Sequence, residues 1–115
     1  MPVKQLLEVS QAAKVLKLLG DSKRLTMIKL LDKHDLCVCE FVDIFEATQP
    51  AISQHLRKLK DACLVKEARK GQWIVYSINK DSEYYALTQS MLSHVPSQDQ
   101  LLIDLEASGQ RISCD

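Results

Sequence analysis

The segment between residues 38 and 78 limits the fold more than any other, because its apolar residues change from helical spacing to β-rich runs. Residues 38–47 and 48–63 predict two short helices that meet at Thr48 and Pro50, a capping hydroxyl and a proline suited to a first helical turn. Residues 65–68 and 73–78 flank a polar tip that contains Gly71, which predicts a β-hairpin. This order of elements predicts a helix-turn-helix followed by a wing.

The remainder of the chain is expected to be mainly helical, because glycine and proline are scarce, with three of each in 115 residues. Apolar spacing predicts further helices over residues 2–19, 21–34, 81–95 and 98–107. The first of them is apolar over more than one stripe, which indicates a partner besides the core. A small chain commonly hides such a helix in a two-fold interface, so we expect a homodimer.

The length of the chain predicts one domain, because 115 residues can bury one core and are too few for two conventional domains. We expect a winged-helix DNA-binding domain over residues 1–108 and a flexible tail over residues 109–115. No apolar run approaches the length of a membrane span, and the first ten residues lack the layout of a secretory signal. These features predict a cytoplasmic protein with no membrane partner.

The formal net charge is zero, but the charges are unevenly distributed along the chain. Between residues 48 and 72, six basic residues face two acidic ones, whereas from residue 81 onward six acidic residues meet only Arg111. The middle of the chain is therefore suited to phosphate and the end is not.

Four cysteines in a chain without a secretory signal are expected to be reduced thiols. They are Cys37, Cys39, Cys63 and Cys114. An isolated cysteine is most often a small buried hydrophobe, but the pair at positions 37 and 39 favours a soft-ligand site. Trivalent arsenic and antimony prefer thiolates in a three-coordinate pyramid, so this pair can supply two of three corners. A helix N-terminus is also expected to favour their thiolate forms.

Four motifs between Leu19 and Ile78 resemble one known family. They are Leu19-Gly20-Asp21-Ser22-Lys23-Arg24, Gln49-Pro50-Ala51-Ile52-Ser53-Gln54-His55-Leu56, Cys63-Leu64-Val65, and a wing that ends in Tyr76. Together they resemble the ArsR/SmtB family of metal-responsive winged-helix repressors. The resemblance implies a mainly α fold, with a two-stranded β-hairpin wing and flanking dimerisation helices, and a protein that is not an enzyme.

The stretch Leu36-Cys37-Val38-Cys39-Glu40 is similar to the thiol motif of the arsenic-responsive branch of that family. The resemblance implies a dimeric repressor that binds a palindromic operator and releases it when As(III) or Sb(III), acting as inducer, binds the cysteines; no other cofactor is required. Some arsenic repressors have a third cysteine where this chain has Val42. The third ligand is then Cys114 or an external thiol, whereas Cys63 lies on the apolar stripe of its helix and is expected in the core.

The helix over residues 48–63 supplies most of the expected DNA contacts. Its amides, hydroxyl and guanidinium can pair with base edges in the major groove: Gln49, Ser53, Gln54 and Arg57. Phosphate contacts are expected from Lys58, Arg69 and Lys70, and Thr48 and His55 complete the set of candidates. For each of these residues the alternative is an ordinary solvated face, and for His55 it is packing against the core.

A thiol redox sensor on the same scaffold is the alternative function, with oxidation of Cys37 or Cys39 as the signal. A disulfide between residues two apart in a helix would be strained, so oxidation would have to unwind the turn or recruit Cys114. No pattern of histidines or acidic residues supports a thiol enzyme.

Overall fold

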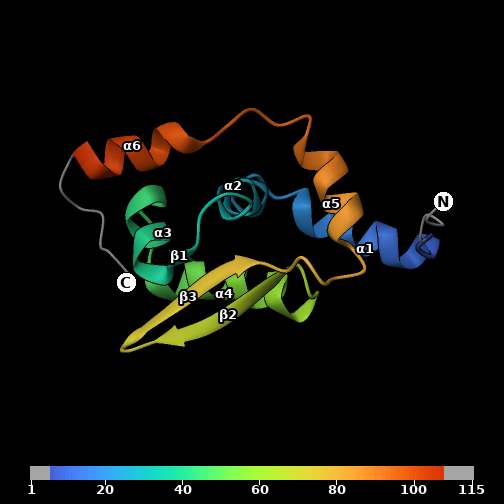
Figure 1. Ribbon diagram of the computed structural model, residues 1–115, viewed down its shortest axis with the longest axis horizontal. Coiled ribbons are helices and arrows are strands. Elements are labelled where there is room, and N and C mark those ends of the chain that lie inside the picture. The colour runs from blue at the N-terminus through green and yellow to red at the C-terminus, as the bar shows by residue number, and fades with distance from the viewer. Residues whose placement is uncertain (1–5, 108–115) are drawn as a thin grey trace.

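A computed structural model describes residues 6–107, in which a small antiparallel sheet lies at one edge of a group of helices (Figure 1). In chain order the elements are α1 (Val9–Leu19), α2 (Ser22–Leu31), β1 (Leu36–Cys37), α3 (Val38–Phe45), α4 (Gln49–Asp61), β2 (Val65–Lys70), β3 (Trp73–Ile78), α5 (Tyr85–Leu92) and α6 (Asp99–Ala107). The helices α3 and α4 form the predicted helix-turn-helix, and β2 and β3 form the predicted wing. The winged helix-turn-helix prediction is confirmed.

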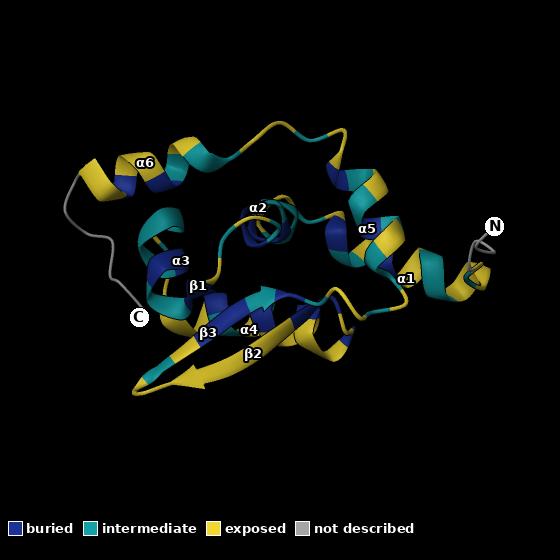
Figure 2. Cartoon of the chain, in the orientation of Figure 1, coloured by how far each residue is buried: buried dark blue, intermediate teal, exposed yellow. Residues whose placement is uncertain are grey.

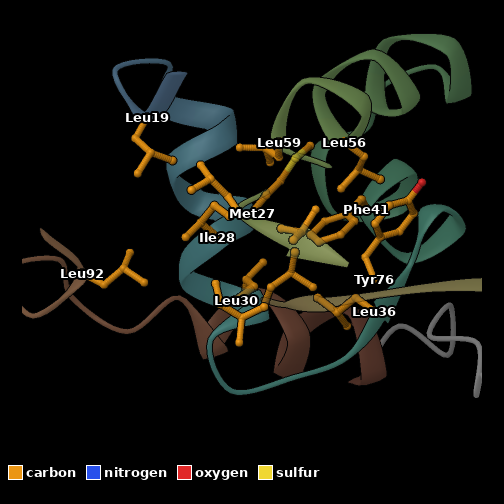
Figure 3. Packing of buried hydrophobic residues seen from close by; sticks show 14 of the residues in the cluster. Leu19, Met27, Ile28, Leu30, Leu36, Phe41, Leu56, Leu59, Tyr76 and Leu92 are labelled. Carbon is orange, nitrogen blue, oxygen red and sulfur yellow. The ribbon is translucent and has the colours of Figure 1, made fainter. Parts of the chain in front are cut away.

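The helix α2 lies at the centre of the molecule and supplies much of the core. Its Met27, Ile28 and Leu30 are fully buried. Figure 3 shows them among side chains from α4, α3 and β3, including Leu59 and Phe41. Burying large apolar side chains is the main source of stability in a domain of this size, so α2 holds the helix-turn-helix and the wing on one core.

Local capping explains where the central helices begin. The Asp21 carboxylate accepts hydrogen bonds from the backbone N–H groups of Lys23 and Arg24, at 2.9 and 3.1 Å. Thr48 Oγ1 accepts one from Ala51 N at 3.4 Å, and a proline occupies the first turn of α4. The Thr48 cap was predicted from the sequence, and each of the two caps satisfies N–H groups that have no partner within the helix.

The sheet has three strands rather than the two predicted, in the order β1-β3-β2. The hairpin pairs residues from Val65 with Ile78 to Lys70 with Trp73, and Gly71, at φ +62°, makes the turn. The missed strand β1 pairs with the other edge of β3. The prediction failed here because two residues are too short to show an alternating pattern.

Two predicted helix starts were also wrong. The helix α1 begins at Val9, because Glu8 and Gln11 form a reciprocal cap there. The helix α5 begins at Tyr85, because a turn in which Tyr85 N donates to Ser82 O comes before it. The helices α2 and α5 also end three residues before the expected ends at residues 34 and 95, and the other helices lie close to their expected positions.

Cys63 is exposed, so the expectation that it lies in the core is wrong. The helix α4 ends at Asp61, and Cys63 adopts a left-handed backbone conformation with φ +64°. This turn breaks the helical register, directs the thiol outward and gives the buried position to Leu64.

The flanking helices lie at opposite ends of the molecule (Figure 1). The helix α6 packs on α3 through the buried side chains Leu102 and Leu105, and the His34 ring and Asp99 Oδ1 are 3.0 Å apart. On α1, by contrast, Val9 is 86% exposed and Leu16 is 48% exposed. On α6, Ile103 is 54% exposed. Within the described residues, both flanking helices therefore present uncovered apolar side chains, and α1 presents more of them.

Within residues 6–107, none of the helices combines the length and the apolar character needed to span a bilayer.

Candidate thiol site and nucleic-acid interface

Cys37 and Cys39 lie at the junction between the sheet and the helix-turn-helix. Cys37 is both the last residue of β1 and the N-cap of α3, and it is 1% exposed. Cys39 lies in the first turn of α3 and is half-buried. Their sulfur atoms are 2.8 Å apart, and both are free thiols. The predicted soft-ligand pair is thus brought together.

Glu40 is a site residue that the sequence interpretation missed. Its Oε1 accepts a hydrogen bond from Cys37 N at 3.1 Å and another from the Cys37 thiol at 3.3 Å. The residue is 2% exposed, so these bonds are shielded from water. A glutamate three residues after an N-cap is a recognised capping pattern, and that spacing could have revealed its role.

The environment of Cys39 favours its protonated thiol. Burial, the hydrogen bond with Cys37, and the charges of Cys37 and Glu40 raise the pKa of Cys39 to about 12. The expectation that the helix N-terminus favours the thiolate is therefore wrong at Cys39, because desolvation and the neighbouring acidic groups outweigh the helix dipole.

A cavity of about 480 Å³ opens beside the two thiols. It joins three parts of the fold, because its walls come from the start of α3, the first residue of α4 and the tip of the wing. The lining residues are Cys37, Val38, Cys39, Val42, Asp43, Gln49, Gln72, Trp73 and Ile74. A molecule bound to the thiols would therefore contact both the predicted reading helix and the wing.

The described residues do not supply a third ligand at this site. Val42 lines the cavity, and Cys63 lines a separate one with Asn79 and Tyr84. Cys114 lies outside the described residues. Within residues 6–107 there is no group of three or more His, Cys, Asp or Glu side chains suited to a metal ion. A third ligand atom for a three-coordinate site must come from the rest of the chain or from the bound molecule itself.

The candidate DNA contacts lie along α4 and the tip of the wing. On α4, Gln49, Gln54, Arg57 and Lys58 are exposed and Ser53 is half-buried. At the wing tip Arg69 and Lys70 are exposed, and Arg69 Nε donates to Gly71 O at 3.2 Å across the turn. Figure 2 shows exposed surface along β2 and on the outer side of α4. The structure thus presents these basic and amide groups to solvent on two neighbouring elements.

Two further candidates are partly engaged within the protein. Thr48 Oγ1 caps α4, which leaves its hydroxyl hydrogen as the group that can reach a phosphate. The His55 ring nitrogen Nδ1 lies 3.2 Å from Arg24 Nη1, and Arg24 Nε donates to Leu18 O. Burial and the nearby cations Arg24, Lys23 and Lys58 lower the pKa of His55, despite an opposing effect of Asp21. His55 therefore connects α4 to α2 as a neutral ring.

A polar cluster fastens the wing to α4. Lys60 Nζ lies 2.6 Å from Glu67 Oε1, and the Tyr76 hydroxyl donates to Glu67 Oε2 at 2.8 Å. The hydrogen bonds from Lys60 and Tyr76 lower the pKa of Glu67. Because Lys60 is on α4 and Glu67 and Tyr76 face each other across the hairpin, the cluster fixes the wing relative to the reading helix.

Sequence comparison finds similar proteins that are regulators. The family model for bacterial regulatory proteins of the arsR family matches residues 21–67. An uncharacterized HTH-type transcriptional regulator of Methanocaldococcus jannaschii is 42% identical over 72 residues, which cover 62% of this chain and 81% of that protein. The arsenic resistance transcriptional regulator ArsR1 of Pseudomonas putida is 40% identical over 68 residues, 58% of this chain and 53% of the relative. The arsenical resistance operon repressor of Bacillus subtilis is 38% identical over 76 residues, 65% and 72% of the two chains.

Solved structures of transcriptional regulators share the fold. Reduced HlyU from Vibrio cholerae has a TM-score of 0.65 and 27% identity, with 75% of this chain and 90% of that chain covered. NolR from Sinorhizobium fredii has a TM-score of 0.61 and 30% identity, with 78% and 96% covered. A homodimeric winged helix-turn-helix DNA-binding domain from Mycobacterium bovis has a TM-score of 0.62 over 84% and 94% of the chains; at 24% identity it shows the fold alone.

Proposed function

This chain belongs to the arsR family of bacterial regulatory proteins, a family of DNA-binding regulators rather than enzymes, and on that premise we propose that it is a repressor whose operator binding ends when As(III) or Sb(III) binds Cys37 and Cys39. One observation carries the proposal: two thiols 2.8 Å apart line a cavity whose other walls include Gln49 of α4 and the wing tip. The names of two relatives, both concerned with arsenic resistance, support the choice of ligand.

Bond formation at Cys37 would weaken the start of α3. The thiol hydrogen of Cys37 is directed to Glu40 Oε1, and an arsenic–sulfur bond replaces that hydrogen. The buried carboxylate then loses one of its donors and faces an electron-rich sulfur, which is costly where water cannot compensate. Because α3 packs on α4, this change reaches the reading helix directly.

Release of DNA requires a large difference in metalloid affinity between the two forms of the protein. To move a population from 99% DNA-competent to 99% released, the metalloid must bind the released form about 10⁴-fold more tightly. Ligand binding that is equal in both forms would not release DNA at all. The loss of the hydrogen bond between the Cys37 thiol and Glu40 on ligand binding provides a physical basis for that preference, because it weakens the start of the helix that packs on α4.

Cys114 is our candidate for the third corner of an inorganic arsenic site. Cys114 is the seventh residue after Ala107, the last residue of α6, and seven residues span at most about 25 Å. Because α6 packs against α3, we propose that the tail brings Cys114 to the pair within one chain. An external thiol is the alternative source of the third sulfur.

The proposed DNA complex is a homodimer of one winged-helix domain, residues 1–108, with a tail over 109–115. The exposed apolar side chains of α1 support a two-fold interface at that end of the molecule. In this arrangement Gln49, Ser53, Gln54 and Arg57 read the major groove. Thr48, His55, Lys58, Arg69 and Lys70 then complete the contacts, mainly to phosphate.

Substitution of both cysteines tests the proposal. A duplex selected in vitro for binding to the reduced protein serves as the operator. The double variant with Cys37→Ser and Cys39→Ser should bind this duplex as the wild type does but should no longer release it with arsenite. Cys63→Ser, which removes an exposed thiol outside the cavity, is the matched control and should release normally. Persistent release by arsenite from the double variant would show that the site is wrong.

A redox sensor is a second candidate, favoured by the distance between the sulfur atoms. The 2.8 Å separation must shorten to about 2.05 Å to form a disulfide. The backbone of Cys37 is extended, at φ −95° and ψ 165°, so only one of the two cysteines lies within a helix and the expected strain is reduced. Release of the selected duplex by peroxide, with loss of two thiols and without arsenite, would favour this function.

A further inference from the structure

The wing tip places apolar side chains where DNA contact does not require them. Trp73 is half-buried and Ile74 is 43% exposed, and both line the cavity beside the thiols. Phosphate contacts use cations and hydrogen-bond donors, so a half-buried tryptophan and an exposed isoleucine next to Arg69 and Lys70 need another explanation. Val38 and Val42 of α3 also line the cavity, so that aliphatic and aromatic groups occur on two of its walls.

The thiols of this cavity provide two ligands, and its remaining walls provide none suited to a soft ion. The other polar lining residues are Asp43, Gln49 and Gln72, whose oxygen and nitrogen atoms are hard donors. A trivalent arsenic atom needs three substituents. An arsenical whose arsenic atom already carries one apolar substituent needs only two thiols. Such a ligand matches both the two thiols of the site and the apolar lining of the cavity.

We propose that this cavity binds the organic group of a monosubstituted trivalent arsenical, with an aromatic group as the best fit and Trp73 as its main contact. The proposal rests on the metalloid function proposed for Cys37 and Cys39, and it names a ligand class for the same site. In the reaction, R–As(OH)₂ and two thiols give R–As(S–Cys)₂ and two molecules of water. Two As–O bonds break, two As–S bonds form, each thiol proton leaves with a hydroxide as water, and arsenic remains trivalent.

The size of the cavity suits this ligand. An apolar cavity of about 150 Å³ is enough for benzene, and the space here is about 480 Å³. Aromatic rings prefer offset or edge-to-face contact, which the half-buried Trp73 ring can offer to a phenyl group. Such a contact, together with burial of the ring, should be worth about tenfold in affinity. The same phenyl group would lie against Gln49 and Gln72, which couples it to both DNA-contacting elements.

Fluorescence provides a direct test, because Trp73 is the only tryptophan in the sequence. Phenylarsine oxide, added to the reduced full-length protein without DNA, should bind one per chain and change the emission of Trp73. Arsenite should cause a much smaller change. The Cys37→Ser and Cys39→Ser double variant should show neither response. Equal effects of the two arsenicals on Trp73 emission would overturn the proposal.

Two variants separate this proposal from the more general function. Trp73→Ala should weaken the affinity for phenylarsine oxide about tenfold and leave the affinity for arsenite within about twofold of the wild type. Trp73→Phe should retain most of the preference for phenylarsine oxide over arsenite. Cys114→Ser should leave phenylarsine oxide binding unchanged, because carbon occupies the third corner. Equal losses for both arsenicals in Trp73→Ala would refute the organic subsite.

The two hypotheses can fail independently. Release of the duplex by arsenite, without any preference for phenylarsine oxide, would support the metalloid-repressor proposal and contradict the organic subsite. A change in Trp73 emission with phenylarsine oxide, without release of the duplex by either arsenical, would support the binding site and contradict the proposed regulatory function.

Discussion

Glu40 Oε1 accepts two hydrogen bonds from one residue, Cys37, through its backbone N–H at 3.1 Å and its thiol at 3.3 Å. The backbone bond caps α3, and the thiol bond holds the sulfur that the proposed ligand would use. The buried Glu40 carboxylate therefore both caps α3 and holds the thiol that is proposed to bind the ligand. This arrangement explains why a change at the sulfur is expected to affect the helix that follows it.

Glu40→Gln should destabilise the protein by about 1–2 kcal/mol, because an amide oxygen is a weaker acceptor for both buried donors. Urea unfolding of the reduced protein at neutral pH measures the change. Glu46→Gln, which alters an exposed carboxylate at the other end of α3, should change stability by no more than about 0.5 kcal/mol. Equal stability of Glu40→Gln and wild type would mean that the buried contacts contribute little.

The cysteines should differ in their rates of alkylation. Iodoacetamide reacts with thiolates, so exposure and a low pKa both favour reaction. Cys63 is exposed and should react before Cys37 and Cys39, because Cys37 is buried and the raised pKa of Cys39 keeps that thiol protonated near neutral pH. Peptide mass spectrometry after brief labelling measures the order. Faster labelling of Cys39 than of Cys63 at pH 7 would contradict the environment described for the pair.

The Glu67 cluster should make stability fall with acid. Lys60 and Tyr76 lower the pKa of Glu67 below its ordinary value of 4.5, so the folded state binds fewer protons than the unfolded state. The resulting stabilisation is present above about pH 4.5 and is lost as the pH falls through the lower pKa of the folded state. Urea midpoints measured from pH 7 to pH 3 should fall less steeply for Glu67→Gln than for wild type.

Tyr76→Phe is the matched variant for this prediction, because it removes one hydrogen bond and keeps the ring. Its acid dependence should lie between those of wild type and Glu67→Gln. Identical pH profiles of stability for all three proteins would show that the folded state does not stabilise the charged form of Glu67 more than the unfolded state does.

The wing-tip cations should control the salt dependence of operator binding. Replacing Arg69 or Lys70 by alanine should lower the slope of log affinity against log salt by about one and weaken different duplexes alike. Arg57→Ala should instead cost about 1–3 kcal/mol on the selected duplex and reduce discrimination. Fluorescence anisotropy across a salt series measures both effects.

Lys33→Ala provides the charge control for these variants, because it removes an exposed cation from the loop that follows α2. Its salt slope should match that of the wild type. A slope unchanged by the Arg69 and Lys70 variants would exclude the wing tip from the proposed interface.

The elements that positioned the reading helix were predictable because their signals are local. Thr48 and Pro50 mark the start of α4, Asp21 marks the start of α2, and Gly71 marks the hairpin turn. Each signal depends on one or two residues and their immediate backbone, so the sequence is sufficient to interpret it.

The missed features depend on distant parts of the chain. Strand β1 exists because Leu36 and Cys37 meet Tyr76 and Val75, and the cavity exists because Trp73 approaches α3. The exposure of Cys63 depends on how α4 ends, where helical periodicity no longer applies. The paired thiols themselves were predicted from their spacing, but the surroundings that raise the pKa of Cys39 became visible only in the folded chain.

The pairing of Cys37 with Val75 has a mechanical consequence. Val75 is on β3, two residues from Trp73, so the residue that carries the buried thiol is itself a rung of the ladder that supports the wing. A displacement of Cys37 would therefore act on β3, and through it on the wing, by way of this pairing.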